Sequence, residues 1–165
     1  MSRGFVKEDD LELAGTDLPE RPVSEHPNYV TPQGLNQLEQ FVEKLANEHR
    51  ALSPKSEDPT VGQKLASIER DLRYYEARLE QAILVEPASE KPTSAVFGTA
   101  VTVEDENGDQ HRFNIVGGDE ADASINKVSY LSPLAKALIG HKVGENVIWK
   151  RPAGDLNLEI IDITY

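Results

Sequence analysis

The chain has 165 residues, a formal net charge of −12 at pH 7, no cysteine and 38% hydrophobic residues. This length suits one ordinary domain or two small units, and the missing cysteine excludes disulfides and thiolate chemistry. Acidic residues outnumber basic ones in each of the segments 1–27, 28–93 and 94–165. Nucleic-acid binding needs clustered Lys and Arg, so direct binding to RNA or DNA is disfavoured and a protein with a basic surface is the expected partner.

Residues 1–27 are acidic and contain Pro19, Pro22 and Pro27 with little periodicity. This composition predicts a flexible acidic leader. The alternative is a docking segment that becomes ordered on a partner. The chain has no apolar run of 18 residues, which predicts a soluble, cytoplasmic protein that does not act on a membrane.

Residues 28–86 are expected to form an antiparallel coiled-coil hairpin, because two apolar series repeat at alternating spacings of three and four. Thr31 and Pro32 have the pattern of a helix N-cap and first position, and Ser53-Pro54 ends the first helix at residue 52. The second helix is expected from residue 60 to residue 85. The two series are Leu35, Leu38, Val42, Leu45, His49, Leu52 and Val61, Leu65, Ile68, Leu72, Tyr75, Leu79, Ala82.

Only residues 53–60 separate the two helices, so they form the tip of the hairpin. The tip contains two adjacent acids, Glu57 and Asp58. They could supply oxygen ligands to a magnesium ion held mostly by a partner, since magnesium takes only one or two carboxylates from many proteins. The alternative is that they only solubilise the loop, with Asp58 also favoured by the N-terminus of the second helix.

Residues 87–94 are a polar linker, and residues 95–165 change to a period of two, which indicates strands. Strands are expected at 100–103, 112–116, 146–150 and 156–164, with a hairpin turn at Asn107-Gly108. Ser132-Pro133 begins one short helix. The second unit is therefore predicted to be a small antiparallel sheet with one short helix, and the fold class is α+β.

The chain offers no self-contained catalytic site. Its four histidines do not share a metal-ligand spacing, and neither a nucleophile elbow nor a phosphate-binding loop is present. His49 falls on an apolar series, where a tolerated polar residue is the expected interpretation. Trp149 is read as core packing, with an interface role as the alternative.

Several motifs in residues 95–165 resemble the bacterial GreA/GreB transcription elongation factors. The similar residues are Phe97-Gly98-Thr99, Asn107-Gly108, the segment 112–117 with Asp119-Glu120, the segment 132–140, Val143-Gly144, Pro152-Ala153-Gly154 and the segment 160–165. The segments 29–35 and 68–74 resemble the two hairpin arms of the family more loosely.

The resemblance implies an FKBP-like C-terminal domain that docks on RNA polymerase and a hairpin that enters the secondary channel of that enzyme. The polymerase remains the enzyme, and this chain is an accessory factor that meets RNA and DNA only through the elongation complex. Residues carried over from the family's docking segment are Ser132, Pro133, Leu134 and Lys136. Acidic tip residues of the family help to hold a second Mg²⁺ at the polymerase active site, where backtracked RNA is cleaved.

The chain departs from the family at the tip, in arm length and in its acidic leader. The family's tip reads Gly-Asp-x-Ser-Glu-Asn, whereas this chain has Ser-Pro-Lys-Ser-Glu-Asp-Pro-Thr at residues 53–60. The hairpin is also shorter. Two mechanisms therefore stay open: cleavage promoted by Glu57 and Asp58, or occupation of the channel in competition with cleavage factors. A prolyl isomerase and a dimerising coiled-coil adaptor are the other classes considered, and a monomer is expected.

Overall fold

A computed structural model describes residues 18–165. Contacts within the chain define two compact units. The first contains residues 37–81 and the described part of the chain before Pro27, and the second contains residues 27–36 and 82–165. We call them the hairpin unit and the sheet unit and describe each by itself.

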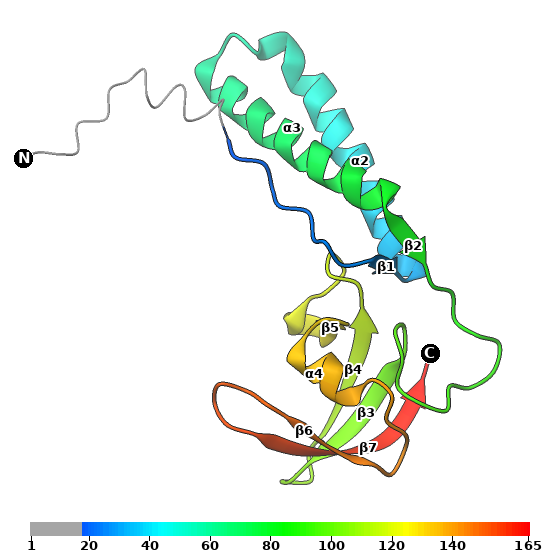
Figure 1. The fold of residues 1–165 in the computed structure, drawn as a ribbon. Coiled ribbons are helices and arrows are strands. Elements are labelled where there is room, and N and C mark those ends of the chain that lie inside the picture. The colour runs from blue at the N-terminus through cyan, green and yellow to red at the C-terminus, as the bar shows by residue number, and fades with distance from the viewer. Residues whose placement is uncertain (1–17) are drawn as a thin grey trace, which may run out of the picture. The chain divides into compact units, whose positions relative to one another are not determined.

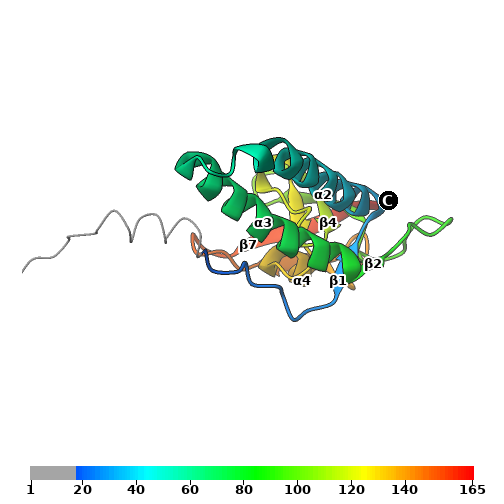
Figure 2. The same ribbon diagram turned by 90° about the horizontal axis from the view of Figure 1, so that it is seen from above.

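Two helices make up most of the hairpin unit: α2 (Pro32–Leu52) and α3 (Pro59–Glu80), which lie side by side in both views of Figures 1 and 2. The expected first helix is confirmed. Its cap is Thr31, whose hydroxyl accepts a hydrogen bond from the Gly34 N–H at 3.0 Å. After Leu52 the chain continues as a single 3-10 turn, η1 (Ser53–Lys55), because the proline at position 54 disfavours a further α-helical turn.

The apolar seam between α2 and α3 is narrow. Leu38, Leu65 and Ile68 are its buried apolar residues, while most other seam positions are half-exposed. The rings of Phe41 and Tyr75 pack with centroids 4.9 Å apart, although Phe41 was not among the expected seam residues. Contacts therefore reach beyond the strict seam, as in a helix pair with a wide apolar stripe.

The expected end of the second helix at residue 85 is wrong. The helix ends at Glu80, and Ala82–Leu84 instead form strand β2, which pairs in parallel with β1 (Asn28–Val30). The Val85 N–H extends this pairing by donating to the Val30 carbonyl at 2.9 Å. The error has a physical cause: the partner of β2 lies more than fifty residues away, and apolar residues at 82–85 fit a helix or a strand equally well locally.

The sheet unit contains a five-stranded sheet with the order β5-β4-β3-β7-β6. Its strands are β3 (Ala100–Asp105), β4 (Gln110–Val116), β5 (Lys127–Ser129), β6 (Asn146–Trp149) and β7 (Leu156–Thr164). The short helix α4 (Pro133–Leu138) packs on the sheet, as Figure 1 shows. The four longer strands confirm the sequence prediction.

The expectation of a purely antiparallel sheet is wrong at the edge formed by β5. β5 runs parallel to β4, and the chain reaches it through a 3-10 turn, η2 (Ala123–Ile125). Asn126 follows with a positive φ of 57° and closes that turn. A three-residue strand carries too little alternation to be recognised in the sequence.

The core of the sheet unit is continuous. Val101, Ile115 and Ile160 are fully buried at its centre. The buried cluster as a whole consists of Ala95, Val101, Val103, Phe113, Ile115, Leu134, Ala135, Leu138, Val147, Leu158, Ile160 and Ile163.

The expected leader lies partly outside the described residues, because the structure describes the chain only from residue 18. Residues 18–26 have no regular secondary structure but contact α3 through side chains such as Glu20 and Arg21. Among the described residues, no helix is long and apolar enough to cross a lipid bilayer.

Candidate partner-binding sites

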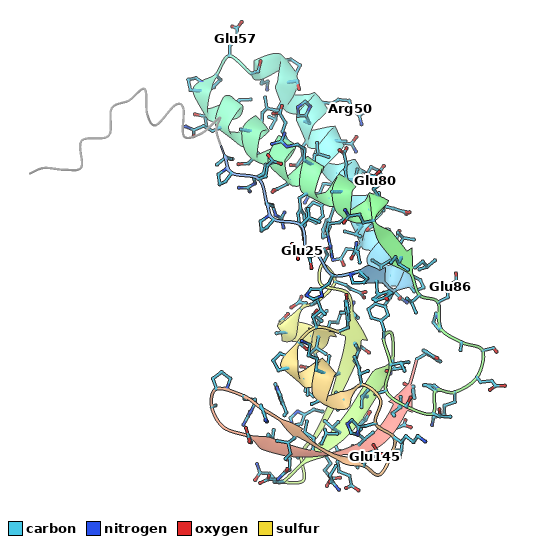
Figure 3. The ribbon with its side chains drawn as sticks, in the orientation of Figure 1. Glu25, Arg50, Glu57, Glu80, Glu86 and Glu145 are labelled. Carbon is cyan, nitrogen blue, oxygen red and sulfur yellow. The ribbon has the colours of Figure 1, made fainter. Side chains whose placement is uncertain are left out.

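The tip of the hairpin presents its two carboxylates in different ways. Glu57 is exposed and projects away from both helices in Figure 3. Asp58 is also exposed, but it is the N-cap of α3: its Oδ1 accepts a hydrogen bond from the Thr60 N–H at 2.9 Å. The sequence placed Asp58 near this helix terminus. The structure adds that one of its carboxylate oxygens already accepts a hydrogen bond from the helix backbone.

The helices next to the tip are joined by a pair that the sequence did not predict. His49 Nε2 lies 2.9 Å from Glu69 Oε1 on the opposite helix, and Ser53 Oγ donates to the His49 carbonyl at 2.7 Å. His49 is thus a polar seam residue with one partner on the opposite helix and one in the tip. Partly exposed pairs of this kind contribute modestly to stability but fix the side chains that make them.

The chain does not form a metal cage by itself within residues 18–165. No group of three or more His, Cys, Asp or Glu side chains is close enough to hold an ion there. The exposed carboxylates of Glu57 and Asp58 are the oxygen ligands that Mg²⁺ prefers, so they fit a shared site to which another molecule contributes the remaining ligands.

The four residues of the expected docking segment have different environments in the sheet unit. Ser132 caps α4, accepting a hydrogen bond from the Ala135 N–H at 3.2 Å. Leu134 is only 3% exposed and belongs to the core. Pro133 and Lys136 are exposed, so they are the residues of this segment that another protein can contact directly.

An apolar cavity of about 250 Å³ lies beside the docking segment. Pro133 and Leu134 form part of its wall, and Phe113, Val128 and Trp149 form much of the rest. The Trp149 ring meets Phe113 edge to face with centroids 6.0 Å apart and carries the Arg151 guanidinium at 5.3 Å. Trp149 therefore packs partly against the core and partly lines a cavity, and the sequence interpretation of core packing was incomplete.

A buried polar network in the sheet unit was not predicted at all. Glu120 is 8% exposed and accepts a hydrogen bond from the Thr31 hydroxyl at 2.5 Å and one from Lys127 Nζ at 3.3 Å. Gly34 leaves room for this carboxylate, because a Cβ there would lie 2.7 Å from Glu120 Oε1. The network therefore orients the Thr31 hydroxyl that caps α2.

Comparisons with known proteins identify the family to which this chain belongs. Residues 90–165 match the family model described as "Transcription elongation factor, GreA/GreB, C-term". Transcription elongation factor GreA of Thermodesulfovibrio yellowstonii is 33% identical over 151 residues, which cover 82% of this chain and 96% of that protein. The chain belongs to the GreA/GreB family of transcription elongation factors.

A second relative agrees with this assignment. Transcription elongation factor GreB of Neisseria meningitidis serogroup B is 32% identical over 157 residues, covering 86% of this chain and 96% of that protein. A solved structure of a GreA/GreB factor from Nitrosomonas europaea is 26% identical and covers 84% of this chain and 99% of that one, with a TM-score of 0.42.

Family membership confirms two predictions made from the sequence. The resemblance carried by the C-terminal motifs is correct, and this GreA/GreB family member is a transcription factor and not itself an enzyme. A helical hairpin followed by a sheet unit is the architecture that both the sequence and the structure give.

Proposed function

We propose that this protein binds RNA polymerase and modulates elongation through the secondary channel of that enzyme. The sheet unit docks on the polymerase, and the hairpin tip acts inside the channel. The observation that carries this proposal is the exposed tip with Glu57 and Asp58 at the end of a two-helix hairpin in a chain of the GreA/GreB family. The protein is an accessory factor, and it meets RNA and DNA only through the elongation complex.

The docking surface is proposed to be Pro133 and Lys136, held in place by the Ser132 cap and by Leu134 in the core. The apolar cavity next to them offers room for an apolar side chain of the polymerase. We expect the double variant Pro133→Ala and Lys136→Glu to lose polymerase affinity at least tenfold in a binding titration.

Lys142→Glu is the matched control for docking, because Lys142 is an exposed lysine of the same unit outside the docking segment. It makes the same charge change and should leave the affinity within a factor of two. Equal affinity of the double variant and the wild type would assign docking to another surface.

Two mechanisms at the tip are compatible with docking. In the first, Glu57 and Asp58 contribute oxygens to a Mg²⁺ ion shared with the polymerase, and such an ion would position the water that cleaves backtracked RNA. Within this chain, Glu57 projects outward and Asp58 offers the oxygen that does not cap α3. In the second mechanism, the hairpin occupies the channel and excludes cleavage factors without stimulating cleavage.

Two observations favour channel occupation. The arms α2 and α3 have 21 and 22 residues, so each is only about 32 Å long at about 1.5 Å per residue. One carboxylate oxygen of Asp58 is engaged by the Thr60 N–H. Both features reduce what the tip can offer to a metal at the far end of a channel, since magnesium requires its ligands at about 2 Å.

A stalled, backtracked elongation complex with labelled RNA and Mg²⁺ separates the two mechanisms. The test variant is Glu57→Gln with Asp58→Asn, which removes both charges while keeping side-chain shape and an N-cap, since Asn caps helices as well as Asp. Cleavage by the wild type that falls at least tenfold in the variant would establish the first mechanism.

A different pattern identifies the regulator. Wild type and variant would then both fail to cleave and would both suppress cleavage by a second, cleavage-competent factor. If neither protein bound the polymerase or changed cleavage, the proposed function would be wrong.

We also infer the finer details that the family resemblance implies. The sheet unit, with α4 against a curved sheet, is FKBP-like, and the protein works as a cytoplasmic monomer with no membrane partner. Because the loop is short, the two helices of one chain bury the apolar seam residues against each other. This argues against dimerisation through the seam. Sedimentation at micromolar concentration tests this, with a mass near 18.3 kDa expected.

A further inference from the structure

Residues 18–26, which we call the strap, lie along α3 within the hairpin unit, as the blue trace in Figures 1 and 3 shows. Glu20 of the strap holds Arg73 of α3 in a two-pronged pair. Arg73 Nε donates to the two carboxylate oxygens at 3.0 and 2.9 Å, and its Nη2 donates to Oε1 at 2.6 Å. This geometry is the specific, side-on form of an arginine–carboxylate pair.

Arg21, the next residue of the strap, is held by three side chains of α3. Its guanidinium carbon lies 3.9 Å from the centroid of the Tyr74 ring and 5.1 Å from that of Tyr75. Its Nη1 donates to Asp71 Oδ1 at 3.3 Å. Aromatic faces together with a carboxylate are the surroundings that favour a planar guanidinium over other cations.

The charges of the strap and of α3 are complementary at successive positions. Burial acts to lower the pKa of Arg21, but hydrogen bonding to Tyr75 and Asp71 raises it overall, so Arg21 stays charged. The hydrogen bond from Arg73 lowers the pKa of Glu20, which therefore stays ionised. The acid and the arginine of the strap thus meet an arginine and an acid of α3.

The strap is held in a way that allows release. The hydrogen bonds that the strap makes to Asp71 and Arg73 run between side chains. The Arg21 and Arg73 side chains are 34% and 54% exposed, and pairs this accessible to water are weak and screened by salt. Pro19 and Pro22 flank Glu20 and Arg21 and disfavour a helical conformation of the strap.

We propose that the flank of α3 formed by Asp71, Arg73, Tyr74 and Tyr75 is a recognition site for an extended peptide segment with an acid followed by an arginine, and that the strap occupies this site in the free protein. A partner protein that presents the same chemistry has to displace the strap. The strap thereby regulates access to the hairpin. This inference does not depend on the proposed polymerase function, because both the site and its occupant belong to this chain.

The competing explanation is that the strap is a permanent third layer that only stabilises the hairpin. A tethered segment has an effective concentration in the millimolar range, so a released site should accept the same sequence as a free peptide, whereas an occupied site should resist it. These two explanations therefore predict different responses to added peptide.

The experiment uses the full chain labelled with ¹⁵N and a synthetic peptide with the sequence of residues 18–27, Leu-Pro-Glu-Arg-Pro-Val-Ser-Glu-His-Pro. Wild type and Arg21→Ala are compared by NMR, first without peptide and then during a titration to several millimolar. We expect Arg21→Ala to shift the amides of residues 70–76. We then expect the peptide to restore the shifts with an apparent affinity at least tenfold higher than for wild type.

Two controls define the chemistry of the site. A peptide with the same Arg21→Ala change should not bind, and Asp71→Asn introduced into the Arg21→Ala chain should weaken binding of the normal peptide several-fold. Unchanged amides in Arg21→Ala would show that the strap is not seated on α3 and would overturn the proposal. Equal peptide affinity for wild type and Arg21→Ala, or no binding to Arg21→Ala, would overturn it too.

If Arg21→Ala perturbs the helices, Arg21→Lys and raised salt provide a second route. Lysine keeps the charge but loses the planar stacking on Tyr74. An increase from low to about 0.5 M salt should likewise shift residues 70–76 of the wild type towards the released state, because it screens the exposed pairs. Wild-type amides that do not move with salt would contradict a releasable strap.

Discussion

The hairpin unit and the sheet unit have cores of different depth. The sheet unit encloses a continuous cluster in which residues such as Ile115, Ile160 and Ile163 have no exposed surface. In the hairpin unit, Leu38, Leu65 and Ile68 are the buried apolar residues among those described. The sheet unit can therefore carry its own stability, whereas the hairpin depends on a few seam residues and on its caps.

The largest effect is expected in the sheet unit. Ile160→Ala removes a side chain with no exposed surface from the centre of the cluster and should lower the free energy of unfolding by about 3–5 kcal/mol. Denaturant unfolding monitored by the fluorescence of Trp149, the single tryptophan, measures it. A loss below 1 kcal/mol would mean that the core is loosely packed.

A smaller effect is expected in the hairpin. Leu38→Ala should lower its stability by about 2–3 kcal/mol, because the neighbours of a thin seam can partly close the cavity. Helix loss by circular dichroism should then precede the change in Trp149 fluorescence, which reports the sheet unit. Coincident transitions would show that the two units unfold together and that the hairpin is not the less stable one.

Two helical glycines, Gly62 in the hairpin unit and Gly34 in the sheet unit, should respond to alanine in opposite ways. Gly62→Ala in α3 adds a Cβ at an ordinary 3.6 Å from the Ser56 carbonyl and should stabilise the hairpin by about 0.5–1 kcal/mol. Gly34→Ala in α2 has the same helical benefit, but its Cβ would lie 2.7 Å from Glu120 Oε1 and should cost about 1–3 kcal/mol. Thermal melts of the two variants should therefore shift in opposite directions, and shifts of the same sign would contradict the buried network.

The smallest effect is expected at the turn between β3 and β4. The hydrogen bond to His111 lowers the pKa of Asp105; burial opposes this, and the N–H groups of Asp109 and Asn107 add to it. Because the folded-state pKa lies below the unfolded one, the stabilisation is present above the ordinary Asp pKa and is lost as the pH falls through the lowered value. The melting temperature of the wild type should therefore fall as the pH is lowered from 5 to 2, and Asp105→Asn should reduce this fall. An equal fall in both proteins would exclude the contribution of Asp105.

Local signals predicted what local interactions decide. Thr31, Pro32 and Ser53-Pro54 define the ends of α2, and Asn107-Gly108 predicts the β3–β4 hairpin; the structure confirms both. The three-residue strands β1, β2 and β5 were missed because their pairing depends on partners distant in sequence. The buried hydrogen bond of Glu120 was missed for the same reason, since its donor, the Thr31 hydroxyl, is 89 positions away.

The candidate sites were predicted unevenly for a related reason. The predicted tip pointed to Glu57 and Asp58, and family motifs pointed to the segment 132–136. Neither signal could show that Leu134 is buried or that Asp58 caps α3. The contacts of Arg21 were hidden because proline-flanked acidic sequence is typical of flexible chain. Only the tyrosines and Asp71, fifty positions later, give that arginine a place to bind.

The division of α2 between the two units has a consequence for how such proteins can change. The first turn of α2, up to residue 36, is grouped with the sheet unit, while its remaining turns are grouped with α3. A matched insertion of seven residues in each arm would therefore preserve the seam and lengthen each arm by about 10 Å, without touching the Thr31–Glu120 network. Arm length can thus be changed independently of the sheet unit, so the distance from the base of the hairpin to its tip can be reset by insertion alone.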